Sequence, residues 1–302
     1  MIGLFGGSFN PIHKGHLQAA RLVIKQRLCR EIWFIPCYKH RFKPKLENFE
    51  HRVNMIKLAI KGENNFKLCL IEKKLAERRK KPNTTIETLH EIKKRYPNKK
   101  FCWIIGSDLL NELPKWYNFE ELAKETFFVI VPIKGFKLNK KILKRIRALV
   151  VKNNAPYISS TKIRESIRAG KVPKTYLTKD VWLYIEKNLL YTDEFSRKVY
   201  KAVRLIPHGR LATYKDVAQL IDTKAYRAVG QVLKRNPFST VPCHRVVKND
   251  GLLGGFSKGR KIKAIKLKKE GIEIYGNEIA NFENLRLNQK ELFFLKKQLQ
   301  KG

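Results

Sequence analysis

The sequence predicts an α/β protein in two parts, a parallel β-sheet covered by helices followed by a smaller, mainly helical part. Up to about residue 190, short apolar runs alternate with helical stretches, which is typical of strands joined by crossover helices. From about residue 193 the segments are short and mostly helical, and two of them have the spacing of a helix-turn-helix. A chain of 302 residues accommodates two domains, and we expect them at 1–191 and 192–302.

The apolar and amphipathic patterns place the individual elements. They predict strands at 2–5, 31–36, 66–71, 101–105 and 127–132, with helices near 14–28, 50–61, 85–96, 117–124, 160–169 and 178–189. The second part is expected to hold helices at 194–205, 214–221, 225–235 and 258–270, then a Lys-rich helical tail from about 287. The basic run 134–147 is interpreted as a solvated helix face.

The composition narrows the class of protein. The chain has 65 Lys and Arg against 26 Asp and Glu, a net charge of +39, which is typical of a protein with a nucleic-acid partner but does not say which part binds it. Codon usage or heat adaptation explains an evenly Lys-rich composition equally well. No run approaches the roughly 18 apolar residues that cross a bilayer, and the opening residues lack the basic region of a secretory signal. Five cysteines without a CxxC pair predict neither disulfides nor a zinc cage, and hence a cytoplasmic location.

A glycine-rich string follows the first strand, Gly6-Gly7-Ser8-Phe9-Asn10-Pro11-Ile12-His13-Lys14-Gly15-His16. A glycine pair at the carboxyl end of a strand lets backbone N–H groups approach a ligand, and the following helix N-terminus favours an anion. His13 and His16 are three residues apart at the start of that helix, so both imidazoles project towards one point. The string therefore predicts a phosphate-handling loop rather than an ordinary turn with two surface histidines.

A second helix start carries similar chemistry. Ile158-Ser159-Ser160-Thr161-Lys162-Ile163-Arg164 offers hydroxyls, N–H groups and a guanidinium to a polyphosphate. Alone, this string is equally consistent with an N-cap and a solvated arginine.

Together with Gly106-Ser107-Asp108, these strings resemble the HxGH nucleotidyltransferases, specifically the bacterial nicotinate-nucleotide adenylyltransferases. The resemblance covers 1–191 and implies a Rossmann-like domain that transfers the adenylyl group of ATP to nicotinate mononucleotide, giving deamido-NAD and pyrophosphate. It implies that His13 and His16 are catalytic at the ATP phosphates and that Mg²⁺ is held through those phosphates. The other implied ATP-binding residues are Gly7, Ser8, Phe9, Asp108, Ser160, Thr161 and Arg164.

Three further residues match family positions that contact the pyridine carboxylate, namely Thr85, Trp116 and Tyr117. They favour nicotinate mononucleotide over the acceptors of other relatives, such as nicotinamide mononucleotide, pantetheine phosphate or glycerol phosphate. Plain packing is the alternative for Trp116.

A reactive cysteine is the main candidate of the second part. The string Pro242-Cys243-His244-Arg245-Val246-Val247 places an imidazole directly after a thiol, and a base beside a cysteine favours its nucleophilic thiolate. The other four cysteines lie in apolar or helical surroundings and are interpreted as packing residues.

The order of motifs from about 193 to 275 resembles the catalytic domain of O6-alkylguanine-DNA alkyltransferases. The resemblance implies a winged-helix-like DNA-repair domain that flips an alkylated guanine out of double-stranded DNA, with Cys243 accepting the alkyl group and no cofactor. It implies that His244, acting through a water, links Cys243 to Glu270 as a base relay. Tyr214 would help to rotate the nucleotide out of the helix, and Arg227 would fill its place in the base stack. Asn236 would hold the loop that carries Cys243. The stretch from Asn236 to Cys243 is about one residue shorter than the family norm.

We therefore expect a fusion of two enzymes. Binding-only relatives of the alkyltransferases replace the reactive cysteine, whereas this chain keeps it. The alternatives are that one half serves only as a DNA-tethering or nucleotide-tethering module, or that the adenylyl acceptor is nicotinamide mononucleotide. The oligomeric state does not follow from the sequence.

Overall fold

The structure is a computed structural model that describes residues 1–39 and 46–301. The contacts within the chain divide it into two compact units. The first contains residues 1–163 and 174–184, and the second contains residues 164–173 and those from 185 onwards. The helices expected at 160–169 and 178–189 thus contribute residues to both units, and the domain boundary after residue 191 stays a prediction.

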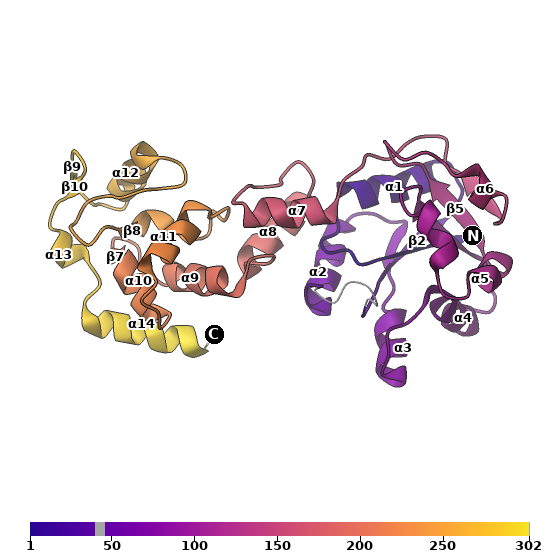
Figure 1. The fold of residues 1–302 in the computed structure, drawn as a ribbon, viewed down its shortest axis with the longest axis horizontal. Helices are drawn as coiled ribbons and strands as arrows, with labels where there is room; N and C mark the ends of the chain where they lie inside the picture. Colours follow the sequence, from indigo (N-terminus) through magenta and orange to yellow (C-terminus); the bar gives the residue numbers. More distant parts are fainter. Residues whose placement is uncertain (40–45, 302) are drawn as a thin grey trace. The chain divides into compact units, whose positions relative to one another are not determined.

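A six-stranded parallel sheet forms the centre of the first unit (Figure 1). Its order is β3-β2-β1-β4-β5-β6, and every neighbouring pair is parallel. The strands are β1 (Ile2–Gly7), β2 (Glu31–Pro36), β3 (Phe66–Leu68), β4 (Phe101–Gly106), β5 (Phe127–Val131) and β6 (Ala148–Val150). This is the strand order of a Rossmann fold, and it confirms the expected fold class.

Helices cover the sheet because its strands are apolar on both faces. The helical elements of this unit are α1 (Lys14–Lys25), α2 (Phe49–Ala59), α3 (Ile71–Arg79), α4 (Thr85–Arg95), η1 (Leu110–Lys115), α5 (Phe119–Glu125) and α6 (Lys140–Leu143). Leu4, Trp33 and Trp103 share one core with residues of α4, η1 and α5. The next residues along two of these strands, Phe5 and Phe34, contact each other instead, as expected for side chains that alternate between the two faces.

The elements confirm most of the expected ranges, correct two and add others that were not expected. The apolar run 66–71 is a strand only to Leu68, because Ile71 begins the helix α3. The sequence pattern did not reveal β6. The basic run 134–147 is helical only at Lys140–Leu143, and since Ile142 and Ile146 are buried, it is not a purely solvated face.

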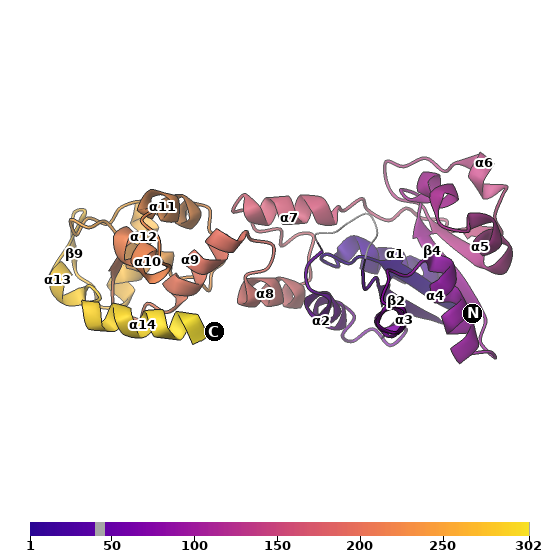
Figure 2. The same cartoon turned by 60° about the horizontal axis from the view of Figure 1, so that its bottom comes forward.

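The second unit is mainly helical. Its helical elements are α9 (Glu194–Arg204), α10 (Tyr214–Leu220), α11 (Tyr226–Lys234), η2 (Cys243–Arg245), α12 (Arg260–Lys269), α13 (Phe282–Leu285) and α14 (Gln289–Lys301). Two small sheets pair β7 (Ala212–Thr213) with β8 (Val246–Val247) and β9 (Ile274–Tyr275) with β10 (Glu278–Ile279). The helix α14 packs along α9 and α10 (Figure 2). Two further helices, α7 (Ser160–Arg168) and α8 (Lys179–Asn188), are shared with the first unit.

The helix-turn-helix expected from the sequence is formed by α10 and α11, which pack against each other. Thr213 caps α10 by accepting the backbone N–H of Asp216, while the Asp216 carboxylate accepts the N–H of Thr213. Arg286 forms an ion pair with buried Asp216 and so attaches the chain before α14 to this motif. Among the described residues, the helices are all too short or too polar to span a membrane.

Candidate active sites

The first candidate site lies where the strand order of the parallel sheet reverses. β1 ends at Gly7 and its neighbour β4 ends at Gly106. From these two strands the sheet continues in opposite directions, to β2 and to β5. In open α/β sheets, ligands bind at the carboxyl ends of the strands at such a switch point. The loop that carries His13 follows β1, and Asp108 follows β4, so both candidates come from this edge of the sheet.

The two histidines of the loop cap α1 reciprocally. The backbone N–H of His16 donates to Nδ1 of His13 at 3.4 Å, and the backbone N–H of His13 donates to Nδ1 of His16 at 3.2 Å. The rings stack with their centroids 3.6 Å apart. The spacing of three residues between His13 and His16 therefore has two effects. It lets the rings accept backbone N–H groups at the start of the helix, and it aligns the two imidazoles.

This arrangement fixes the protonation of both rings. Burial lowers the pKa of His13 to about 4, and burial together with His13 lowers the pKa of His16 well below its usual value. Both rings are thus neutral near pH 7. Because each Nδ1 accepts a backbone N–H, the single proton of each neutral ring lies on Nε2. The pair therefore presents two N–H donors and no positive charge.

The glycines of the loop make room for these rings. Phe9 has a left-handed backbone with φ +44°, and its ring packs against Gly7, where an added Cβ would come within 3.1 Å of it. A Cβ on Gly15 would lie 3.1 Å from Nδ1 of His13. Glycine at position 15 is thus required for the imidazole pair to keep its place.

The remaining ATP-binding candidates come from α7 and from the chain after β4. The Ser160 hydroxyl donates to the carbonyl of Pro11 at 2.9 Å, which attaches the start of α7 to the glycine loop. Thr161 is the next residue of α7, and Arg164 lies one turn further on, where the chain passes into the second unit. Asp108 is exposed, and its carboxylate lies so close to Gly106 that an added Cβ would meet it at 2.2 Å.

The candidate pyridine-binding residues come from α4 and from the end of η1. Thr85 is the first residue of α4, whose start is capped by Thr84 and Glu87. Trp116 is half-buried and packs against the core, whereas Tyr117 is exposed. Part of the Trp116 side chain thus packs in the core, as the alternative interpretation of this residue expects.

A buried polar network next to this site was not predicted. Arg52 is 1% exposed and donates to the carbonyls of Ser8, Cys37 and Tyr38, so it holds the glycine loop against the chain after β2. The backbone N–H of Tyr38 donates to Glu72.

Glu72 extends the network to α4. Its carboxylate also accepts the hydroxyl of Thr88, one turn after Thr85, at 3.2 Å. Burial raises the pKa of Glu72 to about 7. Both Arg52 and Glu72 lie on helices that carry several other charged side chains, so no local signal marks them as buried.

The second candidate site surrounds Cys243, which is 4% exposed on the short helix η2. The amide of Asn236 donates to Sγ at 3.1 Å and to the carbonyl of Phe238 at 2.9 Å. The shorter stretch between Asn236 and Cys243 therefore still brings the amide to the sulfur. Burial raises the pKa of the thiol to about 12, against the hydrogen bond from Asn236 and the charge of Lys263. The resting sulfur is thus protonated.

His244 is held by a carboxylate rather than by backbone groups. Its Nε2 lies 2.7 Å from Oε1 of Glu270. Burial alone would raise the pKa of Glu270, but hydrogen bonds from Arg245, His244 and the N–H of Gly209 outweigh it and lower the pKa to about 2. Burial lowers the pKa of His244. An ionised Glu270 accepts the Nε2 proton of a neutral ring, which leaves Nδ1 of His244 as the basic atom.

Arg245 and Lys263 also belong to this site and were not assigned a role from the sequence. Arg245 binds both oxygens of Glu270 and the carbonyl of Ile206. Lys263 is fully buried and donates to the carbonyls of Val246 and Gly255. Burial lowers the pKa of Lys263 to about 7. The helix α12 is so rich in lysine that its sequence does not distinguish the buried one.

Two of the three DNA-binding candidates, Tyr214 and Arg227, lie on the helix-turn-helix, and the third, Asn236, follows it. Tyr214 begins α10, and its hydroxyl donates to the carbonyl of Gly255 at 3.5 Å. Burial, with a smaller contribution from Cys243, raises the pKa of Tyr214. Arg227 is exposed in the first turn of α11. The structure thus places Tyr214 beside the glycines that follow the Cys243 segment and leaves Arg227 on the surface.

Comparison with known proteins agrees with the geometry of the first site. A family model described as cytidylyltransferase-like matches residues 4–166. The chain belongs to this family. The nicotinate-nucleotide adenylyltransferase of Bacillus subtilis is 39% identical over 197 residues, which are 63% of this chain and 97% of that protein. A probable nicotinate-nucleotide adenylyltransferase of Bacillus cereus is 36% identical over 192 residues, with the same coverage.

Among solved structures, the nicotinic acid mononucleotide adenylyltransferase of Plasmodium falciparum complexed with NaAD is 27% identical, with a TM-score of 0.55. The match covers 63% of this chain and 96% of that one. The first part of the chain is thus a nicotinate-nucleotide adenylyltransferase-like domain in both sequence and fold.

The second part matches a different family. A family model described as 6-O-methylguanine DNA methyltransferase, DNA binding domain, matches residues 194–272. The S. pombe protein Atl1, solved in complex with damaged DNA containing O6-carboxymethylguanine, is 35% identical over 32% of this chain and 96% of that one, with a TM-score of 0.30. The chain is a fusion of an adenylyltransferase-like part and an alkyltransferase-like part.

Proposed function

We propose that the first unit transfers the adenylyl group of ATP to nicotinate mononucleotide, with release of pyrophosphate. The observation that carries this proposal is the stacked, neutral pair of His13 and His16 at the switch point of the sheet. Two Nε2–H donors suit phosphoryl oxygens whose charge grows as the substrate phosphate attacks the α-phosphorus of ATP. No protein nucleophile is needed, so the protein contributes positioning and hydrogen bonds.

The roles of the remaining residues follow the resemblance and the geometry. Gly7, Ser8 and Phe9 offer backbone groups to the nucleotide, and Asp108 suits a ribose hydroxyl. At the start of α7, Ser160, Thr161 and Arg164 are proposed to bind the polyphosphate. Thr85, Trp116 and Tyr117 are proposed to bind the pyridine carboxylate. The loop around His13 and His16 offers imidazoles and backbone groups rather than carboxylates, so Mg²⁺ would be held mainly by the ATP phosphates.

Pyrophosphate release tests this assignment. With ATP and Mg²⁺, we expect nicotinate mononucleotide to be converted much faster than nicotinamide mononucleotide or pantetheine phosphate. Equal or faster conversion of nicotinamide mononucleotide would overturn the choice of acceptor. Absence of pyrophosphate release with all three acceptors would overturn the adenylyl transfer itself.

We further propose that the second unit removes alkyl groups from O6-alkylguanine in double-stranded DNA. The observation that carries this proposal is Cys243 followed by His244, whose Nε2 is bound to the carboxylate of Glu270. Sγ of Cys243 would attack the alkyl carbon, the bond from that carbon to O6 would break, and guanine would leave. The thiol proton would pass through a water to Nδ1 of His244. The departing guanine would take up one proton from solvent, and His244 would return its own proton to solvent. The protein is consumed, because the thioether has no route back.

Mass spectrometry distinguishes repair from lesion binding alone. After incubation with a duplex containing O6-methylguanine, the peptide holding Cys243 should gain the mass of one methylene (methyl replacing hydrogen), and Cys243→Ser should show no gain. Tight binding of that duplex without any added mass would show that the unit is a binding module. Comparing adenylyl transfer with and without DNA tests whether the two activities are coupled.

A further inference from the structure

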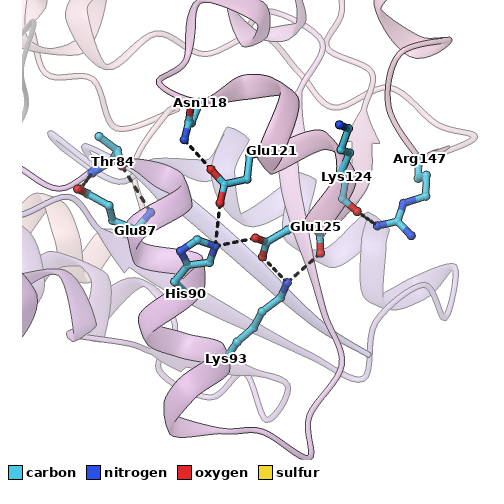
Figure 3. Close-up of polar contacts among 9 residues, drawn as sticks. All are labelled: Thr84, Glu87, His90, Lys93, Asn118, Glu121, Lys124, Glu125 and Arg147. Carbon is cyan, nitrogen blue, oxygen red and sulfur yellow. Dashed lines mark hydrogen bonds and ion pairs between the residues drawn. The ribbon is translucent and has the colours of Figure 1, made fainter.

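A third cluster of reactive side chains lies in the first unit, on the outer helices of the sheet. His90 projects from α4, and Glu121 and Glu125 project from α5 (Figure 3). Nε2 of His90 lies 2.8 Å from Oε1 of Glu125 and 3.7 Å from Oε1 of Glu121. One ligand atom from each residue lies within 4.8 Å of the other two. Neither of the two proposed activities uses these residues.

The spacing of the three atoms suits a small metal ion. Ligands about 2.0–2.1 Å from a tetrahedral zinc ion lie roughly 3.3 Å apart. The two distances from His90 Nε2, 2.8 and 3.7 Å, lie on either side of this value. Glu121 and Glu125 are four residues apart on one helix, so their carboxylates share a face, and the histidine comes from a different helix. Small side-chain rotations would equalise the distances without moving the backbone.

In both carboxylates, the oxygen that points away from His90 accepts a hydrogen bond from another group. Carboxylates that ligate metals are commonly hydrogen-bonded in this way. The Asn118 amide donates to Oε2 of Glu121. The Lys93 ammonium donates to Oε2 of Glu125 and to the Glu125 carbonyl, each at 2.9 Å. In both glutamates, Oε1 is the oxygen that faces His90 (Figure 3). These contacts orient the two carboxylates towards one point.

The charges of the cluster also favour a cation. The Lys93 ammonium reduces the negative potential at the site, yet its side chain is 41% exposed and bonds the outer oxygen, not the one that faces His90. The cluster brings two carboxylates together against one ammonium, within a chain of net charge +39.

We propose that His90, Glu121 and Glu125 bind one divalent metal ion of the zinc class, through Nε2 of the histidine and Oε1 of each glutamate. Imidazole with carboxylates is a donor set that zinc accepts, and the exposed side of the cluster leaves a position for water. Nε2 must offer its lone pair, so the ring proton would lie on Nδ1. The ion would fasten α4 to α5.

The proposed metal site is on the same two segments of the chain as the proposed acceptor-binding residues. Thr85 lies at the start of α4, and Trp116 and Tyr117 immediately precede Asn118, the partner of Glu121. The metal site does not require the proposed adenylyl transfer to be correct, because metal binding is measured directly.

The test uses the full-length Cys243→Ser protein after treatment with a chelator. Isothermal titration calorimetry measures the binding of zinc chloride to it. The Cys243→Ser background removes the Cys243 thiol, a competing zinc ligand. We expect one equivalent of zinc to bind at this cluster, and we expect His90→Ala and Glu121→Gln each to weaken its affinity by more than tenfold. Asn118→Ala should weaken it by about tenfold or more, as removal of such an outer partner does. Glu112→Gln, which removes an exposed carboxylate paired with Lys115, is the matched control and should bind like the parent.

Two further measurements keep the result unambiguous. Far-UV circular dichroism shows whether each variant is folded, and zinc should raise the melting temperature of the parent but not of His90→Ala. Cobalt should give the visible absorption of a tetrahedral nitrogen and oxygen site in the parent alone. Equal zinc affinity of the parent and a folded His90→Ala variant, or no zinc binding by the parent, would show that the cluster is only an ion-pair network.

Discussion

The two proposed active sites use the same side chain in opposite tautomers. In the first unit, His13 and His16 accept backbone N–H groups at Nδ1, which leaves Nε2–H donors. In the second unit, Nε2 of His244 lies against the carboxylate of Glu270, which leaves Nδ1 as a base. One arrangement stabilises developing negative charge, and the other accepts a proton. The partner of each ring therefore decides its chemistry.

The largest expected effect tests the carboxylate that fixes His244. In Glu270→Gln, the amide no longer imposes the Nε2–H tautomer, and Arg245 loses its ionic partner. We expect single-turnover alkyl transfer to fall by about 10²–10⁴-fold, and stability to fall by about 3 kcal/mol because a buried ion pair is broken. The rate should be measured at a temperature where the variant is folded. Glu273→Gln, at an exposed position nearby, should change neither quantity, and an unchanged rate in Glu270→Gln would contradict the base relay.

The corresponding change in the first unit removes a donor rather than a base. We expect His16→Ala to lower kcat for adenylyl transfer by about 10²–10³-fold, the usual effect of losing one donor to developing charge. Alkyl transfer by the same variant should be unchanged. Gln18→Ala, exposed one residue beyond Leu17 on the same helix, is the control. If His16→Ala kept its kcat, the imidazole pair would have no part in the chemistry.

Acid unfolding should separate the two sites by their pH windows. The pKa of His13 is about 4 in the folded protein, against 6.5 for an unperturbed histidine. The unfolded chain therefore binds more protons between these values, and His13 alone should lower the stability by about 3 kcal/mol as the pH drops from 6.5 to 4. The pKa of Glu270, lowered from 4.5 to about 2, predicts a further loss between those two values.

Denaturant unfolding at a series of pH values measures both windows. In His13→Asn, the free energy of unfolding should depend less on pH above pH 4 than in the parent, while the loss of stability below pH 4.5 should remain. In Glu270→Gln, the loss of stability below pH 4.5 should be weaker, while the dependence above pH 4 should remain. A parent protein of constant stability from pH 6.5 to 4 would contradict the neutral imidazole pair.

The smallest effect concerns space around the rings. In Gly15→Ala, the new Cβ would lie 3.1 Å from Nδ1 of His13, so the ring must shift by a few tenths of an ångström. We expect adenylyl transfer to fall by about tenfold, since misplacement of a catalytic group by 1 Å costs about 10²-fold. Alanine also favours the helix, so stability should not fall by more than about 1 kcal/mol. A variant that loses activity only because it unfolds would contradict this explanation.

The sequence predicted the architecture well because its signals are local. The glycine pair, the two histidines and the run around Cys243 are short strings whose chemistry is visible without neighbours. The range of β2 was predicted to the residue, because Glu31–Pro36 is a short apolar run between polar segments. The end of β3 was predicted three residues too late, since the apolar pattern continues from Leu68 into Ile71 although the chain turns into α3 there.

The sequence by itself determined which residue types are present: imidazoles behind a glycine turn, a thiol before an imidazole, and hydroxyls at a helix start. Only the tertiary structure decided their protonation and their partners. Arg52, Glu72 and Lys263 lie on helices with many similar charged residues, and burial alone distinguishes them. Burial and hydrogen bonding arise from segments far apart in the chain, such as Gly209 with Glu270 and His90 with Glu125. Local patterns in the sequence do not contain such contacts, and these contacts set the tautomers and pKa values on which the chemistry depends.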